Sequence, residues 1–190
     1  MAWHLGLGAL LVAASLGLPW WSAARTARAE SRAGMIVELL LEAGHEVGRD
    51  GPPDPEVAFA RLLMLARARD VFLGDLEMAA VDDEPWVVAI SKHYAFRLAP
   101  IPVDAESRSA VGSSPGVAAL AWPIAATGPA HTMFYAPEDG ARAYTRNLTI
   151  NAFGFADRRP SQQAGRRRAR NPFDTRLAYR SQDDERWIIY

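Results

Sequence analysis

Residues 94–98 read Tyr94-Ala95-Phe96-Arg97-Leu98, with a large apolar side chain at every second position. Side chains of a β-strand point alternately to its two faces, so this alternation predicts a half-buried strand. Before residue 94 the apolar spacing is mostly helical, and after residue 98 it is that of strands. The change of period predicts helices first and a sheet afterwards, which is an α+β fold.

Downstream, the apolar runs at 117–124 and 132–136 predict two further strands. Pro137-Glu138-Asp139-Gly140 is typical of a turn, and residues 141–148 are expected to form the return strand of a hairpin. With residues 94–98, these segments predict a small antiparallel β-meander.

The C-terminal part is expected to be less regular. Residues 157–180 hold eight arginines among Pro, Gln, Gly and Asn and have no apolar period, which predicts a mobile loop. Trp187-Ile188-Ile189-Tyr190 is then expected to add a last short strand.

Upstream, helical spacing of apolar residues predicts a helix over 31–47, which the Gly- and Pro-rich residues 48–53 end. Asp54 is a predicted N-cap, followed by Pro55 at the first helical position, and this second helix is expected to end near Asp70. A short helical piece is expected over 73–80.

The N-terminal segment is strongly apolar. Between Trp3 and Trp21 the only ionisable side chain is His4. A helix of this length spans about 28 Å, close to the thickness of the hydrocarbon core of a bilayer. Residues 3–21 are therefore expected to lie in a lipid bilayer, as a single-pass anchor or as a signal peptide. A buried helix of a soluble protein remains the alternative.

Two features bear on processing and orientation. Ala27-Arg28-Ala29 fits a signal-peptidase site, so a secreted protein beginning at Glu30 is an alternative to the anchor. Arg25, Arg28 and Arg32 follow the apolar segment, which favours a cytoplasmic C-terminus by the positive-inside rule.

Composition excludes some chemistry. The 190 residues include no cysteine, which excludes disulfides, thiolate metal sites and thiol catalysis. The formal net charge of −1 gives no overall attraction to nucleic acid. The predicted domains are a membrane anchor or signal at 1–30, an α+β head at 31–156, and an Arg-rich loop with the last strand at 157–190.

Several motifs within residues 75–148 occur in a familiar order: Asp82-Asp83-Glu84-Pro85, Lys92-His93-Tyr94-Ala95-Phe96-Arg97-Leu98, Val117-Ala118-Ala119-Leu120-Ala121-Trp122-Pro123, then Gly128, Thr132-Met133-Phe134, Glu138-Asp139-Gly140 and Tyr144. Together they resemble the C-terminal heads of uncharacterised, pilin-like exported bacterial proteins of planctomycete type. The resemblance implies an N-terminal membrane helix that runs into an antiparallel sheet, and an extracytoplasmic head; no catalytic role is established for that family. Residues 1–30 lack the basic leader and cleavage motif of type IV prepilins, so assembly into a pilus is not predicted.

No set of residues predicts a catalytic, cofactor or metal site. Ser114 lies in a G-x-S-x-G pattern, but the following Pro115 has no N–H to donate to an oxyanion, so a turn is expected there. Single histidines at 4, 45, 93 and 131 lack metal-pair spacing, and Asp82-Asp83-Glu84 is expected to be a solvated turn. A hydrolase using His93 or His131 is a further alternative.

The expected partner is the lipid bilayer, contacted by residues 3–21. Four arginines, Arg166, Arg167, Arg168 and Arg170, are expected to lie in a solvated loop. The alternative is that they contact anionic lipid headgroups. Without interleaved aromatic residues, these arginines do not predict binding to nucleic acid. The leading hypothesis is thus a non-catalytic, membrane-anchored cell-envelope protein with a pilin-like head. The rival hypothesis is a secreted module that binds a ligand or glycan.

Overall fold

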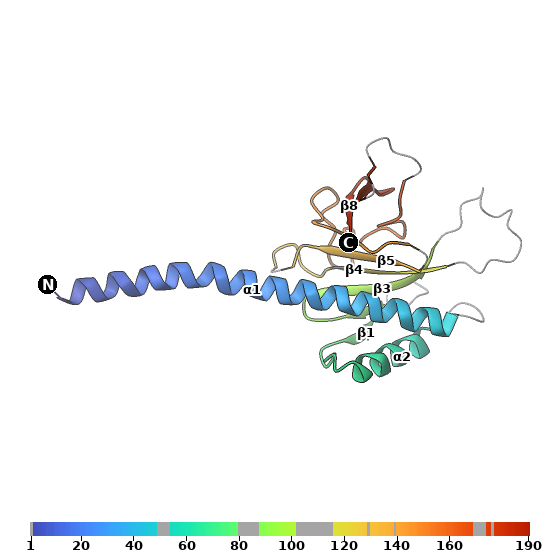
Figure 1. Cartoon of the computed structure of the whole chain (residues 1–190), viewed down its shortest axis with the longest axis horizontal. Coiled ribbons are helices and arrows are strands. Elements are labelled where there is room, and N and C mark those ends of the chain that lie inside the picture. Colours follow the sequence, from blue (N-terminus) through green and yellow to red (C-terminus); the bar gives the residue numbers. More distant parts are fainter. Residues whose placement is uncertain are drawn as a thin grey trace, which may run out of the picture.

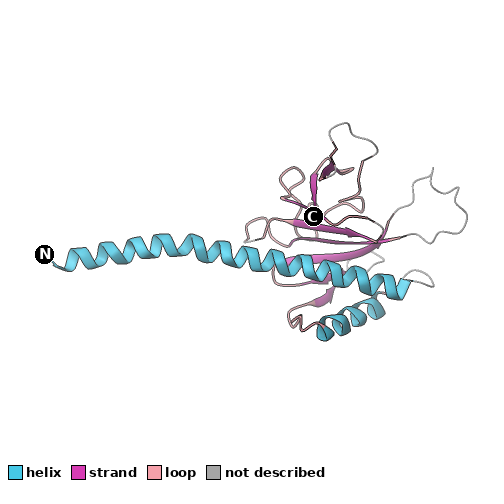
Figure 2. Cartoon of the chain, in the orientation of Figure 1, coloured by secondary structure: helices cyan, strands magenta, loops and turns pink. Residues whose placement is uncertain are grey.

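The computed structural model describes residues 2–48, 54–79, 88–101, 116–128, 130–138, 140–168, 174–175 and 177–190, and the side chains of these residues from 21 onward except that of Val88. Within these residues, two helices precede a sheet of eight strands (Figure 2). The predicted α+β class is confirmed.

Helix α1 spans Ala2–Val47 without a break and is about 69 Å long at 1.5 Å per residue. Its N-terminal part projects away from the rest of the chain, and its C-terminal part lies along the sheet (Figure 1). Ile36, Val37, Leu40 and Ala43 are buried there. The expected helix at 31–47 is therefore the end of a longer helix, and the expected domain boundary at residue 30 falls inside it.

Helix α2 spans Pro55–Ala68 and packs beside α1. Its start is as predicted, because the Asp54 side chain accepts hydrogen bonds from the backbone N–H groups of Glu56 and Val57 at 2.8 and 3.3 Å. Such a cap satisfies backbone donors that the first turn of a helix leaves unpaired. The apolar face of α2 buries Ala58, Leu62 and Ala66 against α1.

The strands are β1 (Glu77–Ala79), β2 (Val88–Ile90), β3 (Tyr94–Pro100), β4 (Val117–Pro123), β5 (Met133–Pro137), β6 (Ala143–Thr145), β7 (Ala178–Arg180) and β8 (Arg186–Ile189). Their order in the sheet is β1-β2-β3-β4-β5-β6-β8-β7, and each pair of neighbours is antiparallel. The expected meander from residue 94 onward is confirmed, and the sheet is larger than expected on both sides of it.

The sheet separates two hydrophobic cores. Tyr94, Phe96 and Leu98 of β3 point to the core shared with the helices, whereas Ala95 belongs to a second core with Trp122 and Trp187. Residues from the segment that follows β6, among them Ala152 and Ala164, cover this second face. The expectation of a half-buried β3 is therefore wrong, because both faces of the strand are covered.

Arg97 shows the consequence for a charged side chain. It points to the second face, is only 3% exposed, and donates hydrogen bonds to the carbonyl oxygens of Pro160 and Ser161 at 3.3 and 2.5 Å. Its guanidinium also lies 5.7 Å from the ring centroid of Trp122. The buried charge is thus compensated by backbone acceptors and an aromatic face.

Three other local predictions need correction. Residues 77–79 form strand β1 in place of the expected helical piece at 73–80, since a short apolar run with Leu73 and Leu76 suits either structure. The return strand is limited to β6. The described part of 157–180 is not the mobile loop that was expected. Ala164 is buried, the backbone of Arg167 forms an isolated antiparallel β-bridge with that of Ser181, and β7 lies in the sheet. The last expected strand is confirmed as β8.

Two glycines of α1, Gly34 and Gly44, differ in the space around them, so replacing each with alanine is expected to change stability in opposite directions. A Cβ at Gly34 would lie 3.6 Å from the Phe134 ring, which is ordinary contact, whereas one at Gly44 would lie 2.5 Å from Leu98 Cδ2. Alanine favours a helix over glycine by about 1 kcal/mol. We therefore expect Gly34→Ala to raise the free energy of unfolding by about 0.5–1 kcal/mol, and Gly44→Ala to lower it by about 1–2 kcal/mol through overpacking. Urea unfolding followed by circular dichroism measures both; equal effects of the two substitutions would contradict this account.

Candidate functional site

An open groove runs between α1 and the β5–β6 part of the sheet and has a volume of about 570 Å³. We call it the α1 groove. Its helical wall repeats every three to four residues, so that it presents one face of α1: Ala27, Glu30, Ser31, Gly34, Met35 and Glu38. Its other wall is formed by side chains in and around the sheet, namely Thr132, Phe134, Tyr144, Arg146 and Tyr190. The absence of a side chain at Gly34 leaves open the space over the Phe134 ring.

An ion pair lies at each end of the α1 groove. At one end, the Thr132 hydroxyl donates to Glu30, and Arg146 Nη1 lies 3.2 Å from Thr132 Oγ1 and 3.6 Å from Glu30 Oε1. At the other end, Arg142 Nε lies 2.9 Å from each oxygen of Glu38. The carboxylates of the groove therefore have cationic partners.

The middle of the groove is aromatic. The rings of Tyr144 and Tyr190 have centroids 5.9 Å apart, and Phe134 lies beside them in the wall. Burial raises the pKa of the Tyr190 hydroxyl above its usual value, so the group is neutral at physiological pH. Within the described residues, neither hydroxyl of this tyrosine pair is hydrogen-bonded to a protein group, which leaves both available to a ligand.

Tyr94 lies behind this wall. Its ring centroid is 6.2 Å from that of Phe134, its side chain is 1% exposed, and among the described atoms its hydroxyl has no hydrogen-bond partner. Burial is the main cause that raises its pKa, and the nearby Glu30 carboxylate adds to the shift. The hydroxyl is therefore a neutral donor held close to the Glu30 end of the α1 groove.

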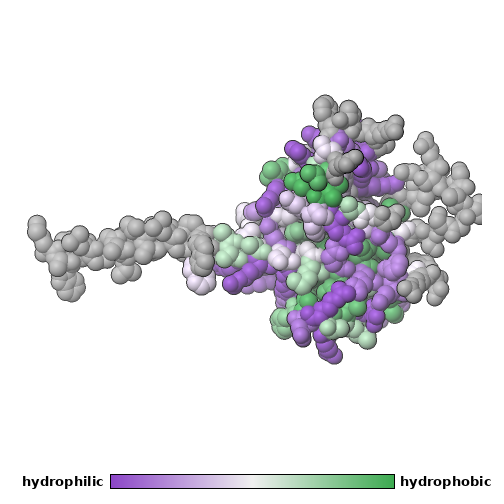
Figure 3. All heavy atoms as spheres, viewed as in Figure 1, coloured by the Kyte–Doolittle hydropathy of each residue, from purple (hydrophilic) through white to green (hydrophobic). Residues whose placement is uncertain are grey.

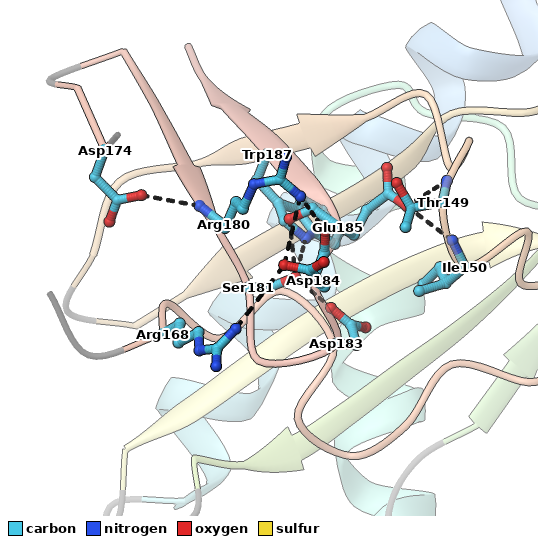
Figure 4. A network of polar contacts seen from close by, with 10 residues as sticks. All are labelled: Thr149, Ile150, Arg168, Asp174, Arg180, Ser181, Asp183, Asp184, Glu185 and Trp187. Carbon is cyan, nitrogen blue, oxygen red and sulfur yellow. Dashed lines mark hydrogen bonds and ion pairs between the residues drawn. The ribbon is translucent and has the colours of Figure 1, made fainter. Parts of the chain in front are cut away.

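A second polar cluster, around Glu185, holds the chain together. Glu185 is 2% exposed and accepts a hydrogen bond from Thr145 Oγ1 at 2.6 Å. It also accepts hydrogen bonds from the backbone N–H groups of Thr149 and Ile150 at 2.9 and 3.0 Å (Figure 4). These contacts tie the turn between β7 and β8 to the segment after β6. Because protein donors occupy both carboxylate oxygens, Glu185 has a structural role.

Asp183 and Ser181 lie in the same turn. The Ser181 hydroxyl donates to Asp183 and accepts from Trp187 Nε1 at 3.1 Å (Figure 4). Burial raises the pKa of the Asp183 carboxyl, and its Oδ2 has no protein partner among the described residues. Over the part of the chain that the structure describes, no three potential metal-ligating side chains converge.

His45, His93 and His131 lie in three different parts of the fold. His45 bonds to Glu138 and so joins the end of α1 to the turn after β5. His93 lies in the turn between β2 and β3, where burial lowers its pKa, and His131 is exposed in the loop before β5. The His4 side chain, the Asp82–Glu84 turn, and Ser114 lie outside the described residues.

Aromatic residues of β3 and β4 lie in the two cores, since Tyr94, Phe96 and Trp122 are at most 3% exposed. Trp122 Nε1 also donates to the Gly154 carbonyl at 2.8 Å. Asn147 is buried, and its amide bonds to the backbone N–H and carbonyl of Ala152, each at 2.8 Å. This amide therefore closes a turn of the chain.

Arg166, Arg167 and Arg168 of the C-terminal segment have interaction partners. Arg167 Nε lies 3.0 Å from Asp174 Oδ2, and its guanidinium lies 5.7 Å from the Tyr179 ring centroid. Arg168 lies 3.9 Å from Asp184, and Arg166 also has a partner. Arg170 lies outside the described residues. Contact between this segment and lipid headgroups remains a prediction.

The residues of the α1 groove were not predicted to form a site. One signal was available, because the small or polar residues at positions 27, 30, 31, 34 and 38 recur at helical spacing on one side of the helix. On the face of the head shown in Figure 3, hydrophobic residues are intermixed with hydrophilic ones and do not form one continuous patch.

Over the described residues, no helix is both long enough and apolar enough to cross a bilayer. The side chains of 2–20, which make up nearly all of the predicted membrane segment, lie outside this description. No protein-family model matches the chain, and no match was found among curated proteins or solved structures.

Proposed function

We propose that this chain is a membrane-anchored cell-envelope protein with a pilin-like, extracytoplasmic head that acts through its surfaces and not by catalysis. The observation that carries the proposal is helix α1, which continues without a break from the apolar residues 3–21 into the core of the head. A long N-terminal helix that ends on an antiparallel sheet is also the arrangement that the resemblance to pilin-like exported proteins implies.

A charge in the middle of the apolar segment tests the anchor. Val12 lies at the centre of residues 3–21, where an arginine costs about 3 kcal/mol for insertion into a bilayer. We expect the wild-type protein to remain in the membrane fraction after alkaline extraction, and Val12→Arg to shift it toward the soluble fraction. Leu148→Arg is the matched control, since Leu148 is 82% exposed on the head. Recovery of the full-length wild-type chain in the soluble cytosol would remove the proposal.

Protease treatment of intact cells, after opening of the outer layer where one exists, tests the orientation. Loss of the head together with protection of a cytoplasmic marker supports the extracytoplasmic placement. Protection of the head would reverse the orientation and leave the anchor intact.

A second candidate function is a secreted ligand-binding module processed after Ala29. The α1 groove favours it, because a concave site with aromatic and polar walls is the usual form of a ligand site. Glu30 would become the first residue, and its contact with Thr132 belongs to the part of the chain that remains. N-terminal sequencing of the mature protein separates the two candidates: Met1 or Ala2 supports the anchor, and Glu30 supports secretion.

A further inference from the structure

We propose that the α1 groove binds a neutral oligosaccharide. The inference concerns the head. It applies to the anchored protein, and a chain processed after Ala29 keeps every lining residue of the groove except Ala27. It rests on one part of the proposed function, namely that the head acts by binding.

The balance of charge in the groove selects an uncharged ligand. Glu30 lies beside Arg146, and Glu38 is bound by both of its oxygens to Arg142. An anionic ligand would compete with these carboxylates, and a cationic ligand with these guanidinium groups. Neither sign of charge is favoured at either end of the site.

The polar groups in the walls select a ligand with many hydroxyls. The lining residues include Ser31, Tyr144 and Tyr190, each of which carries a hydroxyl, and Arg146, whose side chain is 62% exposed. A pure hydrocarbon would remove water from these groups without replacing its hydrogen bonds, which is costly. A saccharide supplies donors and acceptors at these positions.

The aromatic middle of the groove suits the other surface of a sugar. A pyranose ring has faces of C–H groups that stack on aromatic rings, and the tilted Tyr144–Tyr190 pair and Phe134 offer such rings. The volume of about 570 Å³ falls in the range of small-molecule sites. A short oligosaccharide therefore fits both the chemistry and the size of the groove.

The same geometry predicts binding without hydrolysis. The two glutamates of the groove are eight positions apart on α1, so their backbones lie about 12 Å apart along the helix axis. Catalytic carboxyl pairs of inverting glycosidases are roughly 6.5–9.5 Å apart, and those of retaining enzymes are closer still. Moreover, each carboxylate has its own arginine partner, Arg146 for Glu30 and Arg142 for Glu38. The bound saccharide is expected to be released intact.

The test uses the full chain in nanodiscs or in a detergent without a sugar headgroup. The probes are di-, tri- and tetrasaccharides of neutral hexoses and of N-acetylhexosamines, with uronate-containing and deacetylated chains as anionic and cationic comparisons. Saturation-transfer NMR detects binding, and calorimetry measures Kd. We expect at least one neutral chain to bind more tightly than its charged counterparts and to be recovered uncleaved.

Three variants locate the site. Gly34→Leu keeps α1 helical and places a side chain over Phe134, so we expect loss of binding with a folded head. Tyr190→Phe removes one hydroxyl and is expected to weaken binding roughly two- to tenfold. Ala60→Leu adds the same side chain to an exposed position of α2, outside the groove, and should bind like the wild type.

Each outcome decides the proposal. Binding by Gly34→Leu equal to that of wild type would overturn it, as would tighter binding of the charged chains or no binding by any probe. None of these results bears on alkaline extraction, so failure of the saccharide site is distinguishable from failure of the membrane anchor.

Discussion

Replacing Glu185 with alanine is expected to lower the free energy of unfolding of the head by about 3 kcal/mol. The substitution leaves the Thr145 hydroxyl and the N–H groups of Thr149 and Ile150 without their acceptor in a buried site. Each buried polar group left unsatisfied costs roughly 1–3 kcal/mol, less where water can reach it. Urea unfolding of the full chain, followed by circular dichroism, measures the loss.

Two comparisons make the Glu185 result specific. Glu185→Gln keeps one carbonyl oxygen as an acceptor and is expected to lose only part of this stability. Glu77→Ala removes an exposed glutamate from the edge strand β1 and is expected to change stability by less than about 0.5 kcal/mol. An equal loss of unfolding free energy for Glu185→Ala and Glu77→Ala would show that the buried hydrogen bonds of Glu185 do not stabilise the head.

Trp187→Ala should destabilise the head by about 3–5 kcal/mol, the usual range for truncation of a buried aromatic residue. Trp187 is 0% exposed in the core on the second face of the sheet, and its ring centroid lies 5.9 Å from that of Tyr135. The substitution also removes the hydrogen bond from its Nε1 to Ser181. Trp187→Phe, which keeps a ring in the cavity, is expected to lose less.

Trp21 offers the matched control for this experiment. It is 62% exposed on α1, so Trp21→Ala is expected to leave the unfolding free energy of the head within about 0.5 kcal/mol of wild type. The same unfolding curves measure both variants. A small effect of Trp187→Ala would mean that the second core does not stabilise the sheet.

The elements predicted correctly depend on local signals. Asp54 and Pro55 mark the start of α2 because capping involves residues only two or three positions apart. The alternation at Tyr94, Phe96 and Leu98 likewise marks β3. Strand β2 and the covered second face were not predicted, because Ala95 and Arg97 are buried by residues far along the chain that have no periodic pattern themselves.

The α1 groove was missed for the same physical reason. Glu30 and Thr132 are separated by 102 positions, and Glu38 and Arg142 by 104, so their proximity depends on the register between α1 and the sheet. The sequence of α1 contains the stripe that lines one wall, yet nothing in it identifies the facing residues. Only the assembled fold brings charge balance, aromatic rings and free hydroxyls together.

The continuity of α1 also has a mechanical consequence. Helix α1 runs from Ala2 to Val47 with no linker, and the sheet is fixed to its C-terminal part by burial of Ile36, Leu40 and Ala43. Any tilt or rotation at the N-terminal end is therefore transmitted to the whole head. The orientation of the α1 groove then depends on how the first twenty residues are held.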